Sequence, residues 1–150
     1  MITVIPFEFI DLQGDGFHLS LKVKVNNIEA TLILDTGASR TVFDVNRIER
    51  FVAQPEMEEN EQLSTGLGTN SMQSQMLTFS SLCIGNMQWD DYVSVAIDMQ
   101  HINQTYEMLN MPLIDGVLGG DILHKFKAVI DYKRQELKLR FPKKMMVKEG

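Results

Sequence analysis

The sequence of 150 residues has little cysteine and no long apolar run, and each shortage excludes a class of protein. Its single cysteine, Cys83, rules out a disulfide within the chain, and its apolar neighbours predict a buried side chain. No stretch approaches the ~20 consecutive apolar residues that a membrane-spanning helix needs. The first residues also lack the basic start and the small-residue cleavage site of a signal peptide. We therefore expect a cytoplasmic protein with no membrane partner, or an exported one if a signal segment was trimmed.

Positive charge and metal-binding side chains are also scarce. The chain has 14 Lys and Arg residues against 20 Asp and Glu residues, and its net charge of -6 argues against a nucleic-acid partner. The three histidines, His18, His101 and His124, lie far apart in the sequence, without metal-ligand spacing to one another or to Cys83. We therefore expect neither a metal ion nor another cofactor.

The hydrophobic pattern favours a mainly β protein with two or three short helices. Residues 18–25 alternate strictly between apolar and polar side chains, and a turn of two asparagines leads from them into a strand predicted at 29–35. Apolar residues recur at helical spacing over 99–110, and a shorter helix is predicted within 42–51. With 44% hydrophobic and 23% charged residues, the chain is expected to fold as one domain over 1–150.

In the segment LILDTGAS at 32–39, an apolar strand ends directly at the carboxylate of Asp35. Gly37 lets the backbone turn tightly beside this carboxylate, and a carboxylate held rigidly at a strand end can act as a general base. A bare Asp-x-Gly is most often a turn aspartate that bonds to its own backbone. Here the preceding apolar run argues against an ordinary surface turn, so Asp35 is the candidate catalytic residue.

A second motif strengthens this interpretation. GVLGGDIL at 116–123 is again an apolar run that ends in glycines, followed by an aspartate and two aliphatic residues. Together, LILDTGAS and GVLGGDIL resemble the retropepsin-like aspartic proteases, the single-domain relatives of pepsin. The helix predicted at 99–110 resembles an insertion of their non-viral, bacterial-type members. The resemblance extends from about residue 17 to 139 and implies a closed-barrel acid-protease domain, with its core at about 17–141 and a flexible tail at 142–150.

The resemblance also implies a mechanism and a partner. The chain has one Asp-Thr-Gly motif, so a protease of this kind must pair Asp35 with Asp35 of a second copy in a homodimer. Two such carboxylates share a proton and activate a water molecule, which hydrolyses a peptide bond of a peptide or protein substrate. Ala38 offers no hydroxyl that could stabilise the ionised carboxylate, which predicts activity at mildly acidic to near-neutral pH.

The same resemblance gives other residues supporting roles. Thr36 is expected to bond across to the opposite loop of the dimer, and Asp121 is expected to cap the helix that follows it. The catalytic loop is expected to be supported by Thr36, Gly37, Ala38 and Ser39, the second motif to act through Gly119, Gly120 and Asp121, and a flap that closes over substrate to include Gly66, Leu67, Gly68 and Thr69.

Two other functions stay open on the sequence. The chain could keep the acid-protease fold as a catalytically silent peptide-binding or dimerisation module. An apolar strand that ends in aspartate also occurs in enzymes that form an aspartyl phosphate, but the lysine, second aspartate and phosphate-cradling loop of such enzymes are missing. Loss of peptide cleavage in an Asp35→Asn protein would separate the leading hypothesis from both.

Overall fold

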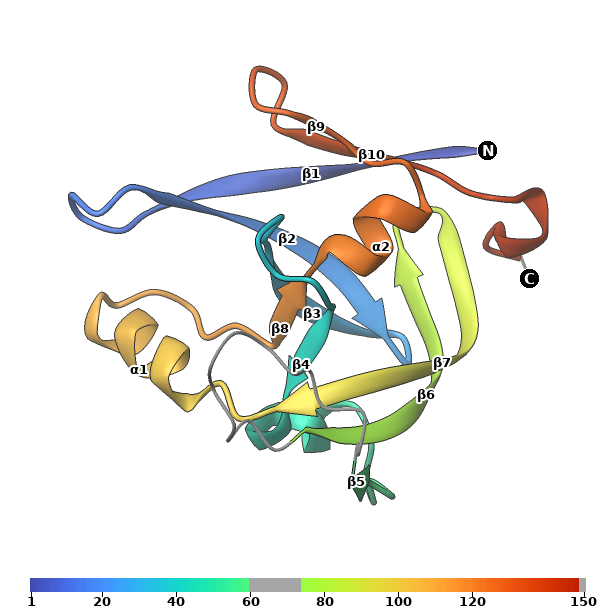
Figure 1. Cartoon of the computed structure of the whole chain (residues 1–150), viewed down its shortest axis with the longest axis horizontal. Helices are drawn as coiled ribbons and strands as arrows, with labels where there is room; N and C mark the ends of the chain where they lie inside the picture. The colour runs from blue at the N-terminus through green and yellow to red at the C-terminus, as the bar shows by residue number, and fades with distance from the viewer. Residues whose placement is uncertain (60–73, 149–150) are drawn as a thin grey trace.

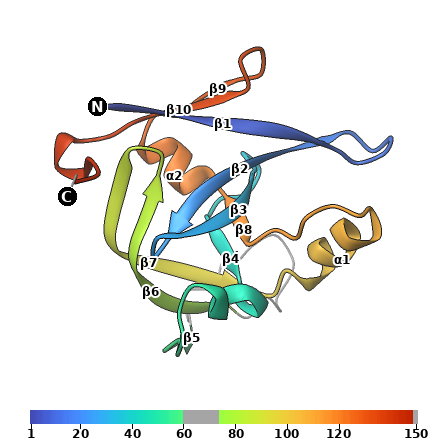
Figure 2. The ribbon, with the colours of Figure 1, turned by 180° about the vertical axis from the view of Figure 1, so that it is seen from behind.

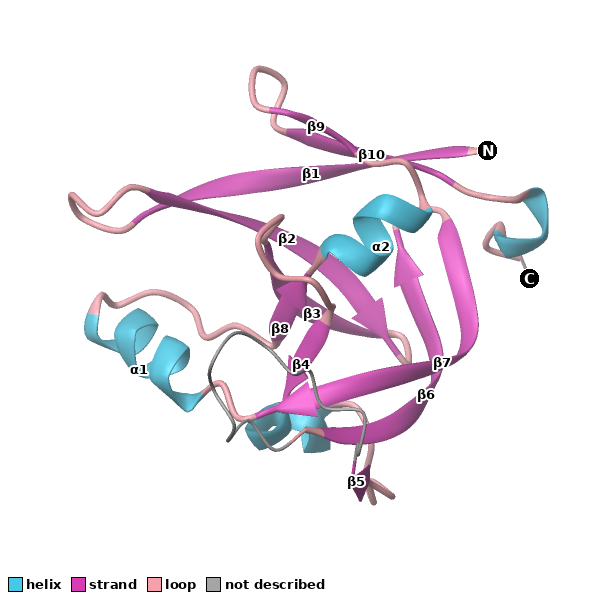
Figure 3. Ribbon diagram, viewed as in Figure 1, coloured by secondary structure: helices cyan, strands magenta, loops and turns pink. Residues whose placement is uncertain are grey.

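The computed structural model describes residues 1–59 and 74–148, and its elements are mainly β-strands (Figure 3). The strands are β1 (Ile2–Asp11), β2 (Phe17–Val25), β3 (Ile28–Leu34), β4 (Val42–Asp44), β5 (Glu58–Glu59), β6 (Gln75–Ile84), β7 (Met87–Ile97), β8 (Gly116–Leu118), β9 (Val129–Asp131) and β10 (Glu136–Arg140). The helices are the 3-10 helices η1 (Val45–Arg50) and η2 (Lys143–Met145) and the α-helices α1 (Gln100–Met108) and α2 (Gly120–Lys125). In the described residues, no helix is long and apolar enough to cross a membrane.

A subset of the strands closes into a barrel. Hydrogen-bonded neighbours follow the order β6, β7, β4, β8, β3 and β2, and a further pairing of β2 with β6 completes the ring. Most of these pairs are antiparallel, but β3 runs parallel to β8, and β4 runs parallel to β7. The remaining strands extend the sheet, β5 from β6, and β1, β10 and β9 in turn from β2. The predicted mainly β, closed-barrel fold is therefore confirmed.

The apolar patterns of β2 and β3 explain where the interior of the barrel lies. From Leu19 to Val25 the apolar residues of β2 are buried and the lysines between them are exposed, as the alternation predicts, whereas the phenylalanine at the start of the strand is exposed. β3 differs because its last residues are all buried. Leu32 and Leu34 belong to the barrel core, whereas Ile33 belongs to a second apolar cluster. An apolar run that is buried on both faces therefore ends directly at Asp35.

β1, β10 and β9 form a layer along one side of the barrel, and α2 lies between this layer and the barrel strands (Figures 1 and 2). The first half of β1 pairs with β10, and its second half pairs with β2. Ile122 and Leu123 of α2 are buried in the same core as Leu137 and Leu139 of β10. The layer and the barrel thus share one apolar core, which fixes α2 between them.

The two ends of the chain also make backbone contacts. The Met1 amino group donates to the Phe141 carbonyl at 3.0 Å, and the Phe141 amide donates back to the Met1 carbonyl at 2.9 Å. Further on, the Val147 amide donates to the Asn86 carbonyl at 2.8 Å. The segment predicted as a tail at 142–150 therefore has backbone contacts as far as Val147.

The predicted helices are present with shifted bounds. The helix expected at 99–110 is α1, which packs over the second apolar cluster and contributes Tyr106 to it. The helix expected within 42–51 is η1, which begins only at Val45. Residues 42–44 pair instead with β7 and β8, because the barrel needs a strand between them.

Cys83 is only half-buried, so the expectation of a buried cysteine was wrong. Leu82 and Ile84 on either side of it are buried in the core, and the alternation of the strand turns Cys83 outward, opposite Lys24 of β2. Partial burial raises the pKa of the Cys83 thiol, and the charge of Asp90 raises it further. The thiol therefore stays protonated near neutral pH, which argues against a nucleophilic role.

Candidate active site

Asp35 follows directly on β3, where this barrel strand reaches the surface. Its amide donates to the Leu118 carbonyl at 3.0 Å, which extends the parallel pairing of β3 with β8. The Gly37 amide donates to Oδ1 of Asp35 at 2.9 Å, and the Ala38 amide donates to the Asp35 carbonyl at 3.2 Å. Asp35 is exposed, yet its own loop fixes the direction of its carboxylate.

The second motif is hydrogen-bonded to the Asp35 loop through its backbone. The Gly120 amide donates to the Ala38 carbonyl at 2.7 Å, and the Asp121 amide donates to the Ser39 carbonyl at 3.1 Å. A Cβ atom built on Gly119 would lie 2.5 Å from the carbonyl oxygen of Arg40. Because that contact is with backbone, rotating a side chain would not relieve it. The close approach of the two motifs therefore requires glycine at position 119.

Asp121 joins the same two segments through its side chain. Its Oδ1 atom accepts from the amide and from the hydroxyl of Thr41, at 2.8 and 2.7 Å. The same hydroxyl accepts from the Gly119 amide at 3.0 Å, and Thr41 is 2% exposed. The expectation that Asp121 is the cap residue of α2 was wrong, because Gly119 holds the cap position; Asp121 lies in the first turn, where its Oδ1 atom also accepts from the Ile122 amide at 2.8 Å. The sequence analysis did not single out Thr41.

The other predicted loop residues lie around the carboxylate. Thr36 is exposed beside Asp35, Ser39 is exposed and contributes its carbonyl, and Ala38 packs against the second apolar cluster. A Cβ atom on Gly37 would lie 3.2 Å from Oδ1 of Asp35, so glycine allows the backbone to approach the carboxylate closely. The bond expected from Thr36 to an opposite loop needs a second copy and stays a prediction. The predicted flap residues, Gly66, Leu67, Gly68 and Thr69, lie outside the described residues.

A cavity of about 470 Å³ opens beside Asp35 and Thr36. Its walls come from β2, β3, α1, β8 with the segment before it, and the turn after β9. The other lining side chains are Phe17, His18, Leu19, Ile33, Leu34, Ile102, Ile114, Val117 and Tyr132. Most of them are aliphatic or aromatic, but polar atoms contribute nearly half of the cavity surface, so the carboxylate borders a space of mixed polarity that is large enough for a bulky side chain.

The sequence profile of the family described as aspartyl protease matches residues 21–122, which contain the Asp35 loop and most of the second motif. The chain belongs to this family. The structure also has the fold of known retropepsin-like proteases, which confirms the resemblance seen in the sequence. The crystal structure of a retropepsin-like aspartic protease from Rickettsia conorii superposes with a TM-score of 0.56 at 20% identity, and the match covers 93% of this chain and 89% of that chain.

Two further structures of the same kind match. The retroviral protease-like domain of Ddi1 from Leishmania major gives a TM-score of 0.52 at 14% identity, covering 83% of this chain and 94% of that chain. The EIAV protease in complex with the inhibitor HBY-793 gives a TM-score of 0.51 at 16% identity, and the match covers 77% of this chain and 93% of that chain. At identities of 14–20%, the similarity to these three structures establishes the fold of this chain. A search of curated protein sequences finds no match.

In this member of the aspartyl protease family, a buried aspartate ties α1 to the barrel. Asp44, at the end of β4, is 2% exposed, and its carboxylate accepts from the Met99 amide at 3.2 Å and from Nδ2 of Asn103 at 2.9 Å. Asn103 also donates to the Ile114 carbonyl at 3.0 Å and accepts from the Ile114 amide at 2.8 Å. Because Ile114 lines the cavity, this network fixes α1 and the cavity wall together.

A second buried aspartate, Asp115, holds the start of β8. Its Oδ2 atom accepts from the Thr31 amide at 2.9 Å, and its Oδ1 atom accepts from Nε of Arg47 at 2.8 Å and from the Arg50 guanidinium. Asp115 is 2% exposed, so its charge needs these partners. The sequence analysis singled out neither buried aspartate, although each directly adjoins an apolar strand.

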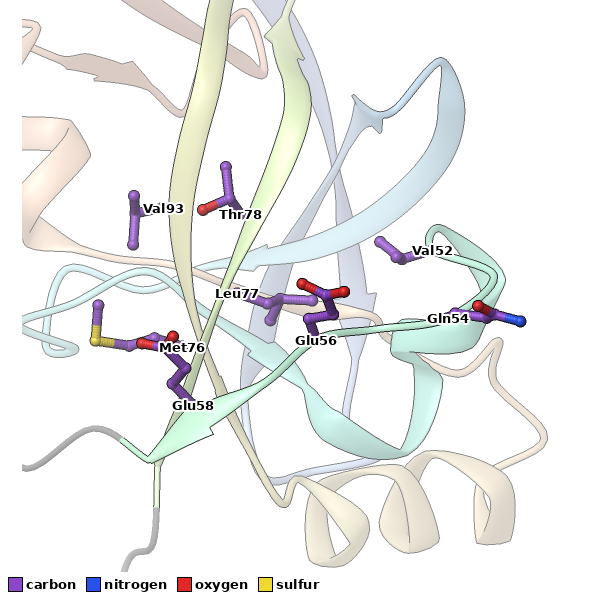
Figure 4. A pocket seen from close by; sticks show the side chains of 8 residues that line it. All are labelled: Val52, Gln54, Glu56, Glu58, Met76, Leu77, Thr78 and Val93. Carbon is purple, nitrogen blue, oxygen red and sulfur yellow. The ribbon is translucent and has the colours of Figure 1, made fainter.

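Another cavity, of about 520 Å³, shares no lining residue with the cavity at Asp35 (Figure 4). The segment after η1, β5, β6 and β7 bound it, and its charged lining residues are Glu56 and Glu58. Over 1–59 and 74–148, no group of three or more His, Cys, Asp or Glu side chains is placed to hold a metal ion. Of these two cavities, the one lined by the predicted catalytic residue is the cavity beside Asp35.

Proposed function

We propose that the protein is an aspartic endopeptidase that works as a homodimer, with Asp35 of both copies in one active site. The proposal rests on the Asp35 carboxylate, which is exposed, oriented by the Gly37 amide and placed at the edge of a cavity lined mostly by aliphatic and aromatic residues. The chain has one Asp-Thr-Gly motif, so a pair of catalytic aspartates requires a second copy across a two-fold axis. Membership of the aspartyl protease family supports the same assignment.

The reaction follows from the electrostatics of two neighbouring carboxylates. At a separation of about 3 Å they share one proton, because both cannot easily stay ionised at that distance. The ionised carboxylate takes a proton from a water molecule, whose oxygen attacks the carbonyl carbon of the peptide bond. The protonated carboxyl group donates to the carbonyl oxygen, where negative charge develops. The carbon–nitrogen bond then breaks as the leaving nitrogen takes up a proton.

The neighbouring residues have supporting roles in this proposal. Thr36 is placed beside Asp35 and would bond across to the second copy, which would hold the two carboxylates together. The second motif keeps the loop in place through the contacts of Gly119, Gly120 and Asp121. Ala38 lacks a hydroxyl, so we expect activity at mildly acidic to near-neutral pH.

Cleavage of a diverse peptide mixture, read by mass spectrometry from about pH 3.5 to about pH 7.5, tests the proposal. The wild type should cut peptides, and Asp35→Asn should lower the rate by about a hundredfold to ten-thousandfold, because the general base is lost. Asp91→Asn is a matched control. Asp91 is an exposed residue of β7 with a positive φ of 52°, a conformation that asparagine tolerates, and it does not line the cavity.

The dependence on enzyme concentration tests the homodimer separately. Specific activity should rise with concentration as dimers form, and sedimentation at the same concentrations should show the dimer. A monomer that cuts at the full rate would refute a shared pair of aspartates. Equal cleavage by the wild type and Asp35→Asn would refute the catalytic role of Asp35. A wild type that binds peptides without cutting them would fit a silent binding module instead.

A further inference from the structure

A histidine–tyrosine pair forms part of the cavity beside Asp35. His18 of β2 lines the cavity, and its Nδ1 atom lies 2.6 Å from the hydroxyl oxygen of Tyr106 on α1. The two rings are stacked, with their centroids 5.9 Å apart and their planes 23° from parallel. These residues are 88 positions apart in the sequence, so only the fold brings them together.

The tyrosine of this pair is held firmly. Tyr106 is 1% exposed and packs in one cluster with Ile33, Ile114 and Val117, which line the same cavity. Its helix is anchored through Asn103, which bonds both to the Asp44 carboxylate and to the backbone of Ile114. The Tyr106 hydroxyl is therefore a fixed reference point, and a hydrogen bond to it orients the imidazole of His18.

The hydrogen bond also selects the form of the imidazole. Burial raises the pKa of Tyr106 to about 12, so its hydroxyl keeps its proton at any working pH of the protein. Nδ1 of His18 lies 2.6 Å from the hydroxyl oxygen and can accept that proton when the ring is in its Nε2–H tautomer. When Nδ1 of a neutral imidazole accepts, the ring proton lies on Nε2. The capacity of His18 to donate toward a ligand is then concentrated at Nε2.

The cavity around His18 indicates which kind of substrate side chain its Nε2 atom could contact. Most of the lining residues are aliphatic or aromatic, polar atoms contribute nearly half of the cavity surface, and the volume of about 470 Å³ accommodates a bulky side chain with a polar end. Asp35 and Thr36 are already assigned to the reaction. This leaves His18 and Tyr132 as the lining residues with a polar group for the side chain, and of these His18 has its polar group oriented by a buried partner. Resting on the proposed function, we propose that His18 is a specificity-determining residue that favours a substrate side chain with a hydrogen-bond acceptor at the end of a bulky aromatic group. Tyr106 is its positioning residue.

Two peptides of nearly identical shape test this assignment. One carries 4-methoxyphenylalanine, whose oxygen accepts a hydrogen bond, and the other carries 4-ethylphenylalanine, which has no such oxygen. Each residue is placed in turn on either side of the bond that the wild type cuts. At one of these positions the wild type should favour the methoxy peptide in kcat/KM by about threefold to tenfold, the size expected for one net hydrogen bond.

The variants separate recognition from folding. His18→Phe should bring the ratio of the two rates to about one, and Tyr106→Phe should lower it in the same direction because the imidazole loses its orientation. Tyr92→Phe is the matched control, since Tyr92 is another buried tyrosine but lies in β7 and does not line the cavity. This control should keep the wild-type ratio. A wild-type ratio near one at both positions, or a ratio that survives in His18→Phe, would overturn the assignment.

Two measurements keep the test independent of catalysis. If the wild type cuts no peptide of the diverse mixture, the proposed function fails, and the preference is measured instead as the ratio of Kd values for the two aromatic residues placed in a peptide that the Asp35→Asn protein binds. Equal Kd values, or no binding, would overturn the role of His18 as well. Nitrogen NMR of the imidazole should show the ring proton of His18 on Nε2 in the wild type and a mixture in Tyr106→Phe. A proton on Nδ1 in the wild type would also overturn it.

Discussion

Asp35 and Asp115 adjoin the same pair of parallel strands at opposite ends, and they differ in burial and in hydrogen bonding. Asp35 follows β3, is exposed, and accepts one hydrogen bond from the Gly37 amide. Asp115 precedes β8, is 2% exposed, and accepts from the Thr31 amide and from two arginines. The strand pairing places one carboxylate at the cavity and the other at the far end of β8.

This difference separates a structural carboxylate from a reactive one. A buried carboxylate whose oxygens already accept from several donors stabilises the fold, but it has little capacity left to bind water or substrate. An exposed carboxylate with one directed bond can still accept a proton and contact a ligand. We therefore expect changes at Asp115 to lower stability, and changes at Asp35 to lower activity while the fold persists.

Asp115→Ala should produce the largest loss of stability. The change leaves Arg47 and Arg50 without their carboxylate and the Thr31 amide without its acceptor. Breaking a buried ion pair in this way costs about 3–5 kcal/mol, and we expect the lower end because both arginines reach solvent in part. Urea denaturation measures the free energy of unfolding. Asp15→Ala, at an exposed turn position with no positive φ, should change it by less than about 0.5 kcal/mol, and an equal loss in both variants would contradict the comparison.

A smaller effect should follow from the backbone contact that positions Asp35. Gly119→Ala would place a Cβ atom 2.5 Å from the Arg40 carbonyl oxygen, so the Asp35 loop must shift, at a cost of about 1–3 kcal/mol together with lower kcat. Gly120→Ala is the matched control, because its Cβ atom would lie 3.3 Å from the Ala38 carbonyl oxygen and the change favours the helix. If both variants lose the same stability and activity, the close approach at Gly119 does not position the loop.

The features that sequence reasoning found are local along the chain. The apolar run before Asp35, the glycine two residues later and the glycines of the second motif each act on near neighbours, so a short segment reveals them. The strand pattern of β2 and the helix α1 were predicted for the same reason. Cys83 shows the limit of this approach, because apolar neighbours do not fix which face of a strand a residue occupies.

The missed residues act across long separations. Thr41 meets Asp121 across 80 positions, and Asn103 meets Asp44 across 59. Nothing in the immediate surroundings of these residues marks them as partners, since ordinary threonines, asparagines and aspartates occur in any turn. The pairing of β4 between β7 and β8 brings them together, and the closure of a barrel decides that pairing. Asp121 was predicted to cap a helix for the same reason: the helix is its neighbour in the sequence, whereas Thr41 lies 80 positions away.

Asp98 is intermediate between Asp35 and Asp115, because it is exposed like Asp35 but accepts from more than one donor like Asp115, and the smallest effect is expected here. The amide of Gln100 donates to its Oδ1 atom at 2.9 Å, and Nδ2 of Asn46 donates to the same atom at 2.8 Å. The Gln100 bond, and next the Asn46 bond, lower the pKa of Asp98 below its ordinary value of 3.8. Because the pKa is lower in the folded state, the stabilising contribution is present above about pH 3.8 and is lost as the pH falls through the folded value.

Asn46→Ala should therefore raise the pKa of Asp98 part of the way toward 3.8, because the Gln100 amide still donates. Carbon NMR of the side-chain carboxyl group during an acid titration measures this pKa directly. Glu49→Ala is a suitable comparison, since Glu49 is an exposed residue of η1, like Asn46, and makes no contribution to the lowered pKa. An unchanged titration of Asp98 in Asn46→Ala would mean that the bond between η1 and the segment before α1 does not persist in solution. Asp98 would then be held by its own turn alone, as Asp35 is held by Gly37.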